Sequence, residues 1–269
     1  MKKLMLGNEA AARGLYEAGC ALISSYPGTP STEITERAAQ YDEIYCEWAP
    51  NEKVAMEVAF GAALAGKRSA CVMKHVGLNV AADPLFTIAY TGVNAGMVIC
   101  VADDPGMHSS QNEQDSRHYA VSAKIPMLEP ADSAEARDFA KRAFELSEEY
   151  DTPVFLKLCT RISHSQSIVE LGQRVEPPRR PYEKDIAKYV MVPGNARPRH
   201  PIVEERTRRL TAFAETTDLN REEMGEDTSI GIITSSTSYQ YAREVFGPKA
   251  SILKLGLVNP LPKQKILDF

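Results

Sequence analysis

Short apolar runs alternate with longer segments in which apolar residues recur at helical spacing along the first 160 residues. The short runs predict strands at residues 20–24, 43–47, 69–73, 96–102, 125–128 and 153–158. The longer segments predict helices at residues 8–18, 33–40, 51–66, 79–91 and 131–149. Continuously apolar strands are typical of a parallel sheet with helices on both faces. The pattern therefore predicts an α/β fold with a doubly wound, mostly parallel, six-stranded sheet.

The pattern changes after residue 160. Residues 161–227 are rich in proline and charge and show no sustained period, which predicts a linker with short helices at 186–190 and 204–215. The strand–helix–strand pattern returns over residues 228–269 and stops a few residues into another helix. We therefore expect a domain at 1–160, a linker at 161–227 and an incomplete α/β domain at 228–269, and a chain that is part of a longer polypeptide.

Composition narrows the possible partners and compartments. The 31 basic and 36 acidic residues give a net charge of -5, which argues against nucleic acid as the main partner. Five widely spaced cysteines contain no CxxC pair, so they predict reduced thiols rather than a metal site, as in a reducing cytosol. No signal segment or apolar run of membrane-spanning length is present. These features predict a cytoplasmic protein without membrane contact.

Polar segments follow several of the predicted strands. They cover residues 27–30, 50–52, 74–77 and 103–118, and the last two are expected to be loops. Ligands of doubly wound folds bind at the carboxyl ends of the strands. The sequence therefore predicts a binding site where these segments meet.

Glu52 stands out within that site. Asn51 is a suitable N-cap for the following helix, and Glu52 lies on the same stripe as the small and apolar residues of that helix. Glu57 is rotated toward the other face. A carboxylate is costly to bury unless it has a hydrogen-bonding or charged partner, and unpaired ones are often found at functional sites. The alternative is that Glu52 only complements the helix dipole.

Six segments, in consecutive order, resemble the 2-oxoacid:ferredoxin oxidoreductase family, and most strongly its indolepyruvate-using branch. They are residues 7–10, 25–33, 51–55, 73–79, 103–106 and 108–115. The resemblance covers about residues 1–165, and it implies a thiamine diphosphate-binding domain of the pyrimidine type. The residues from Ser229 onward resemble the start of a transketolase C-terminal-like domain.

The family uses thiamine diphosphate, and the resemblance aligns Glu52 with the glutamate that activates this cofactor. Such a carboxyl group must reach a ring nitrogen of the aminopyrimidine in a dry pocket, which the apolar stripe around Glu52 would provide. Thr29 aligns with a threonine that contacts substrate. Arg117 aligns with an arginine that binds the substrate carboxylate. A guanidinium suits this role because it can donate two parallel hydrogen bonds to a carboxylate.

Other residues of the aligned loops are candidates for holding the cofactor. They are Pro27, Gly28, Lys74, His75 and Gly77. Pro27 and Gly28 could equally serve only to shape a tight turn. One of Lys74, His75, His108 and His118 could orient substrate or carry protons, although each could also be an ordinary polar residue.

Two features of the family are missing from the sequence. It has neither the Gly-Asp-Gly…Asn-type metal motif nor the ferredoxin-like cysteines. The resemblance therefore implies that other polypeptide regions bring the diphosphate site, Mg²⁺ and the 4Fe-4S clusters. It also implies a homodimer in complex with a beta subunit.

The resemblance implies an enzyme component that oxidises an aryl 2-oxoacid with coenzyme A. The products would be an acyl-CoA, CO2 and reduced ferredoxin. Two alternatives stay open from the sequence: a non-oxidative thiamine diphosphate-dependent decarboxylase subunit, and an assembly module without catalytic activity.

Overall fold

The computed structural model describes all 269 residues and contains a seven-stranded central sheet. Its strand order is β12-β6-β7-β5-β4-β2-β3. The bounds are β2 (Leu22–Ser25), β3 (Tyr45–Trp48), β4 (Ser69–Lys74), β5 (Met97–Asp103), β6 (Met127–Leu128), β7 (Val154–Cys159) and β12 (Leu257–Asn259). Strands β2 to β7 are parallel, which confirms the predicted sheet. The sequence did not predict β12, which adds an antiparallel edge.

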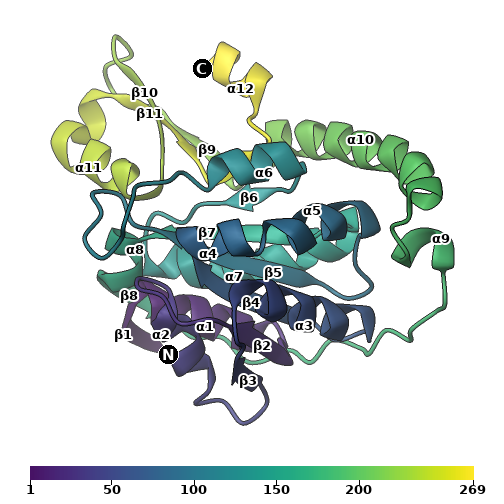
Figure 1. Ribbon diagram of the computed structural model, residues 1–269. Coiled ribbons are helices and arrows are strands. Elements are labelled where there is room, and N and C mark those ends of the chain that lie inside the picture. Colours follow the sequence, from purple (N-terminus) through teal and green to yellow (C-terminus); the bar gives the residue numbers. More distant parts are fainter.

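Helices cover both faces of this sheet (Figure 1). One face carries α1 (Gly7–Glu17), α2 (Thr32–Ala38) and α7 (Ser133–Tyr150), and the other carries α3 (Glu52–Leu64), α4 (His75–Val80), α5 (Ala82–Thr91) and α6 (Arg117–Ala123). Side chains alternate between the faces along each strand. In β5, Val98 and Cys100 enter the first core, whereas Met97 and Ile99 enter the second. Both faces of the strand are therefore buried, which explains its continuous apolar run.

The segment after β4 differs from the prediction. Residues 74–77 were expected to form a loop, but α4 begins at His75, directly after the strand ends at Lys74. The single helix predicted at 79–91 is accordingly divided into α4 and α5. The local sequence contains Gly77, which disfavours a helix by propensity. Packing of α4 against α3 overrides that preference.

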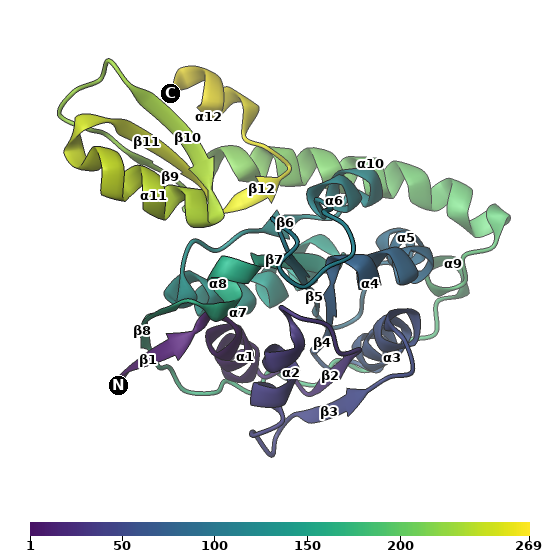
Figure 2. The same ribbon diagram turned by 60° about the vertical axis from the view of Figure 1, so that its left-hand side comes forward.

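The linker is more structured than the sequence predicts. It contains α8 (Thr160–His164), β8 (Gln166–Glu170), α9 (Ile186–Tyr189), α10 (Pro193–Thr216) and β9 (Asn220–Glu223). Strand β8 pairs with β1 (Lys2–Leu6) in a separate two-stranded antiparallel sheet. The expectation of a short helix at 204–215 is wrong, because α10 is 24 residues long and runs past α5 (Figures 1 and 2).

Two buried arginines hold α10 against the carboxyl end of α5. Arg199 Nε donates to the carbonyl of Tyr90 (2.8 Å), and Arg206 donates to the carbonyls of Ala89 and Asp151. Carbonyls in the last turn of a helix lack partners within the helix, so cations there satisfy them and oppose the helix dipole. The inner face of α10 is therefore partly charged, which hides its period in the sequence.

The tail forms a small sheet of its own at the β12 end of the central sheet (Figure 2). Its strand order is β10-β11-β9. The remaining elements are β10 (Gly231–Ser235), α11 (Ser236–Phe246), the short 3-10 helix η1 (Gly247–Lys249), β11 (Ser251–Leu255) and α12 (Lys263–Asp268). Strands β10 and β11 are parallel, as the strand–helix–strand pattern predicts. No helix of the structure combines the length and apolarity needed to span a membrane.

Candidate active site

Glu52 is the first residue of α3 and is buried. The Asn51 side chain accepts a hydrogen bond from the Val54 backbone N–H (3.0 Å), so it caps the helix as expected. Glu52 is 9% exposed, and its carboxylate forms no hydrogen bond or ion pair within the chain. Its oxygens are not among the enclosed polar atoms that lack a partner, so the unpaired carboxylate is open to a ligand.

Gly77 of α4 lies directly against that carboxylate. A Cβ atom at position 77 would be 2.4 Å from Glu52 Oε1 and 2.7 Å from its Cδ. These distances are far below van der Waals contact. The absence of a side chain at position 77 therefore makes the space that the Glu52 carboxylate occupies.

Glu52 lines a cavity of about 530 Å³ at the carboxyl ends of β2 and β4. Five of the predicted site residues line this cavity: Pro27, Gly28, Thr29, Glu52 and Lys74. The other lining residues are Tyr26, Val76, Ser109, Ser110 and Gln111. The geometry thus brings together segments that are far apart in the sequence, at the edge where a doubly wound fold binds ligands.

The loop 104–116 forms one wall of the cavity and is fixed by hydrogen bonds. The Asp104 carboxylate accepts from the Ser109 backbone N–H (2.8 Å), the Ser110 hydroxyl and the Thr160 hydroxyl (2.7 Å). Burial raises the pKa of Asp104, but these hydrogen bonds outweigh burial and hold its pKa well below the usual range. Lys74 Nζ also donates to the carbonyl of Ser109.

The predicted histidines do not line the Glu52 cavity. His75 is fully buried, and its Nε2 lies 3.2 Å from the carbonyl oxygen of Asn112, which belongs to the same loop. Its Nδ1 has no partner. His108 and His118 are exposed. The structure therefore gives His75 a contact with the loop and gives the other two histidines no contact with the cavity.

Arg117 lies in a different cavity, of about 540 Å³, between the central sheet and the tail. Its guanidinium is paired with two carboxylates: Nε is 2.6 Å from Glu129 Oε1, and Nη1 is 3.0 Å from Asp115 Oδ2. Burial lowers the pKa of Arg117, but Glu129 and Asp115 outweigh it and raise the pKa. Arg117 is not brought together with Glu52, and its role in substrate binding stays a prediction.

The sequence did not identify the buried ion pairs around Arg117. Lys157 lies 3.3 Å from Asp103 and 3.2 Å from Glu129, and all three are buried. Lys157 lies inside a strand that reads as apolar, so no local signal separates it from core residues. Asp103 was placed in the polar segment after β5, but its pairing with Lys157 could not be predicted. Tyr26, Ser109 and Ser110 were also missed individually, although their loops were predicted to form the site.

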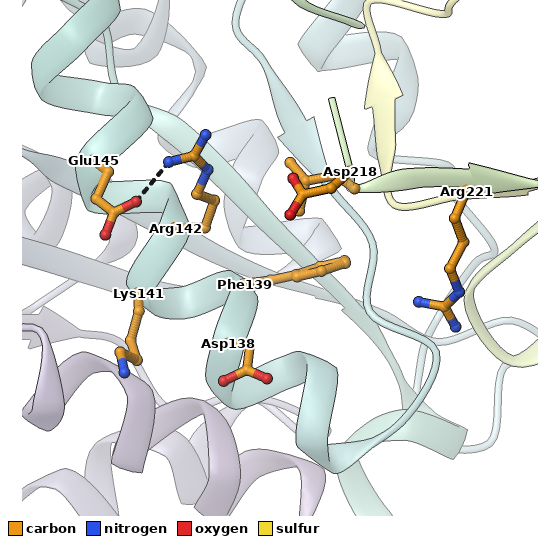
Figure 3. Close-up of a pocket in the computed structure, with 8 residues that line it drawn as sticks. Asp138, Phe139, Lys141, Arg142, Glu145, Asp218 and Arg221 are labelled. Carbon is orange, nitrogen blue, oxygen red and sulfur yellow. Dashed lines mark hydrogen bonds and ion pairs between the residues drawn. The ribbon is translucent and has the colours of Figure 1, made fainter. Parts of the chain in front are cut away.

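A further cavity, of about 440 Å³, opens between α7 and the segment before β9 (Figure 3). Three acidic and three basic side chains line it, among them the ion-paired Arg142 and Glu145 (2.7 Å). It contains no residue from the carboxyl end of a central strand. Its lining carries equal numbers of acidic and basic side chains, which is typical of a solvated surface. The structure contains no group of three or more His, Cys, Asp or Glu residues that could hold a metal ion.

The structure is a doubly wound α/β unit with an unpaired carboxylate at the carboxyl edge of its parallel sheet. Residues 13–229 match the family described as "Pyruvate flavodoxin/ferredoxin oxidoreductase, thiamine diP-bdg", and the chain belongs to that family. The family that the sequence motifs resemble is thereby confirmed.

Curated relatives agree with this assignment. The chain is 44% identical to "Indolepyruvate oxidoreductase subunit IorA" of Archaeoglobus fulgidus, over 100% of this chain and 45% of the relative. It is 45% identical to the protein of the same name from Methanothermobacter thermautotrophicus, with the same coverage of each chain. The chain thus spans about half the length of the curated relatives it matches.

A solved structure shows the same fold. It is titled "2-oxoglutarate:ferredoxin oxidoreductase from Magnetococcus marinus with 2-oxoglutarate, coenzyme A and succinyl-CoA bound". The TM-score is 0.81 at 19% identity, with coverage of 100% of this chain and 56% of the other.

Proposed function

We propose that this chain supplies the aminopyrimidine half of a thiamine diphosphate site in a 2-oxoacid oxidoreductase. The whole enzyme would oxidatively decarboxylate an aryl 2-oxoacid, such as indolepyruvate, with coenzyme A and ferredoxin. The observation that carries the proposal is Glu52: a buried carboxylate without a protein partner, on a cavity at the carboxyl edge of the sheet. Membership of a family described as binding thiamine diphosphate supports it.

The residues of the cavity fit this end of the cofactor. The carboxyl group of Glu52, which has no partner in the chain, would donate its proton to a ring nitrogen or share it with that nitrogen, and Gly77 leaves the room that it needs. Pro27 and Gly28 form a wall from the end of β2, and Thr29 places a hydroxyl in the same cavity. When bound, thiamine diphosphate supplies the carbon nucleophile that attacks the keto group of the substrate. Glu52 would hold the proton that this activation requires.

The remaining parts of the enzyme would come from other polypeptide regions. These parts are the diphosphate and Mg²⁺ site and the 4Fe-4S clusters that pass electrons to ferredoxin. Relatives are named as subunits, which supports a complex with a beta subunit, and we include a homodimer in the proposal. Five free cysteines fit a reducing compartment, so we include the cytoplasm as the location.

The test uses the full complex with the variant Glu52→Gln. We expect turnover of an aryl 2-oxoacid with ferredoxin and coenzyme A to fall by about 100-fold or more, the usual size of an acid–base contribution. Glu57→Gln, on the exposed side of α3, is the matched control and should keep its activity. Full thiamine diphosphate-dependent turnover by Glu52→Gln would contradict the proposal. Turnover without ferredoxin reduction would instead indicate a non-oxidative decarboxylase.

A further inference from the structure

Three lysines of the chain are buried, and two of them have carboxylate partners. Lys157 pairs with Asp103 and Glu129, and Lys254 pairs with Glu135. Lys74 is 7% exposed and forms no ion pair. An ammonium group is costly to bury without a counter-ion. Lys74 is therefore the one buried lysine whose charge the chain leaves unbalanced.

The hydrogen bonds of Lys74 lead to the same conclusion. Its ammonium carries three donors, and one of them is directed to the carbonyl of Ser109. No other protein acceptor bonds to it. Gly28 lies against the stem of the side chain, since a Cβ at position 28 would be 3.1 Å from Lys74 Cβ. The position of the side chain is thus fixed by the Ser109 carbonyl and by the space at Gly28, while donor capacity remains.

Lys74 lines the same cavity as Glu52 and Thr29, and no other basic residue lines it. Lys74 and Glu52 form no ion pair with each other. The cavity therefore offers one carboxylate and one ammonium at separate positions, and neither forms an ion pair within the chain.

We propose that the Lys74 ammonium binds the carboxylate of the 2-oxoacid. This inference rests on the proposed function, in which Glu52 contacts the aminopyrimidine. In thiamine diphosphate the diphosphate lies at the opposite end from the pyrimidine, and the carbon that reacts with substrate lies between the two. A cation in the cavity of the pyrimidine is therefore better placed to bind the substrate than the diphosphate. Arg117 is the other candidate, but its guanidinium is already paired with Glu129 and Asp115 and faces another cavity.

The test compares Lys74→Gln with Lys53→Gln in the full complex. Glutamine keeps an N–H donor for the Ser109 carbonyl but removes the charge, whereas Lys53 is an exposed lysine paired with Asp83. For Lys74→Gln we expect KM for the aryl 2-oxoacid to rise about 10- to 100-fold, the effect of losing a charged hydrogen bond. The affinity for thiamine diphosphate, measured by calorimetry, and KM for coenzyme A should stay within about 2-fold.

A binding experiment separates this inference from the proposed function. Wild-type complex should bind an unreactive aryl carboxylate more tightly than the matching amide, and Lys74→Gln should lose that preference. An unchanged KM and an unchanged preference would overturn the role of Lys74. A weaker affinity for thiamine diphosphate or coenzyme A alone would also overturn it, because Lys74 would then bind a phosphate. If wild-type complex oxidises no 2-oxoacid, the proposed function fails, and the carboxylate preference alone decides the role of Lys74.

Discussion

Gly77 and Glu52 occupy complementary space: the missing side chain of the first leaves room for the carboxylate of the second. A Cβ atom at position 77 would lie 2.4 Å from Glu52 Oε1. Helix α4 can therefore pack closely against the start of α3, and the carboxylate is kept at the cavity rather than turned toward solvent. This contact links the packing of two helices to the geometry of the proposed cofactor site.

The variant Gly77→Ala tests this relationship. Alanine normally favours a helix over glycine, but here it should lower the free energy of unfolding by about 1–3 kcal/mol because the site is overpacked. It should also displace Glu52 and weaken thiamine diphosphate binding by the full complex by about 10-fold or more. Denaturant unfolding and calorimetry measure the two effects.

Gly61→Ala is the control for that experiment. Gly61 lies in the interior of α3, and a Cβ there would meet no atom within 4 Å. Its replacement should stabilise the protein by about 0.5–1 kcal/mol and leave cofactor binding unchanged. Wild-type cofactor affinity in Gly77→Ala would show that the position of Glu52 does not depend on Gly77.

Ser236 begins α11 with a φ of 52°, in the left-handed region that favours glycine. Ser236→Gly should therefore raise the free energy of unfolding by about 1 kcal/mol. The same change at Ser238, inside α11, should lower it by about 0.5 kcal/mol. Thermal unfolding of the two variants checks the contrast, and equal destabilisation by both would contradict it.

Arg206 is predicted to be a main anchor of α10. It is 3% exposed, and burial lowers its pKa to about 10. Arg206→Met would leave the carbonyls of Ala89 and Asp151 without this donor, so we expect a loss of about 2–3 kcal/mol in the free energy of unfolding. Arg208→Met, on the exposed side of the same helix, should change it by less than about 0.5 kcal/mol. Similar stabilities of the two variants would refute the anchoring role.

Glu17 should contribute to stability in a pH-dependent way. Burial raises its pKa, but hydrogen bonds from Arg13, the Gly172 backbone N–H and Arg137 outweigh burial and hold the pKa below 4.5. A carboxyl group whose pKa is lower in the folded state stabilises the protein above its unfolded pKa, and that contribution is lost as the pH falls through the folded pKa.

The variant Glu17→Gln isolates this contribution. At pH 7 it should lower the free energy of unfolding by about 3 kcal/mol, because it removes a buried carboxylate and leaves the partly buried Arg13 and Arg137 without their partner. The difference from wild type should shrink as the pH falls below about 4.5. Exposed Glu36 provides the control Glu36→Gln, which should match wild type at every pH. A difference that stays constant between pH 7 and pH 3 would rule out Glu17 as the source.

Much of the central domain could be predicted from the sequence. The strands of a parallel sheet are buried on both faces, so β4 and β5 read as uninterrupted apolar runs and are located correctly. Glu52 could be placed as well, because an N-cap at Asn51 and the apolar stripe of α3 fix both the start and the buried face of the helix. The local pattern of apolar residues was sufficient to predict those elements whose position depends only on which residues are buried.

The rest depended on contacts between distant residues. Helix α10 was shortened in the prediction because Arg199 and Arg206 point inward to carbonyls of α5, which no local period reveals. The alignment favoured Arg117 for the substrate carboxylate and gave Lys74 only as a candidate for holding the cofactor or orienting substrate. The sequence could not show that Glu129 and Asp115 already pair with Arg117. Pairing of buried charges is a tertiary property, and the sequence carries no periodic signal for it.

The most direct test of the account is hydrogen–deuterium exchange at the reactive carbon of thiamine diphosphate bound to the full complex. The exchange rate, measured by NMR after rapid acid quench, reports activation of the cofactor independently of substrate, coenzyme A and ferredoxin. If Glu52 contacts the aminopyrimidine, Glu52→Gln should slow this exchange by about 100-fold or more, while Glu57→Gln exchanges at the wild-type rate. Exchange at the wild-type rate in Glu52→Gln, with the cofactor bound, would contradict the central claim.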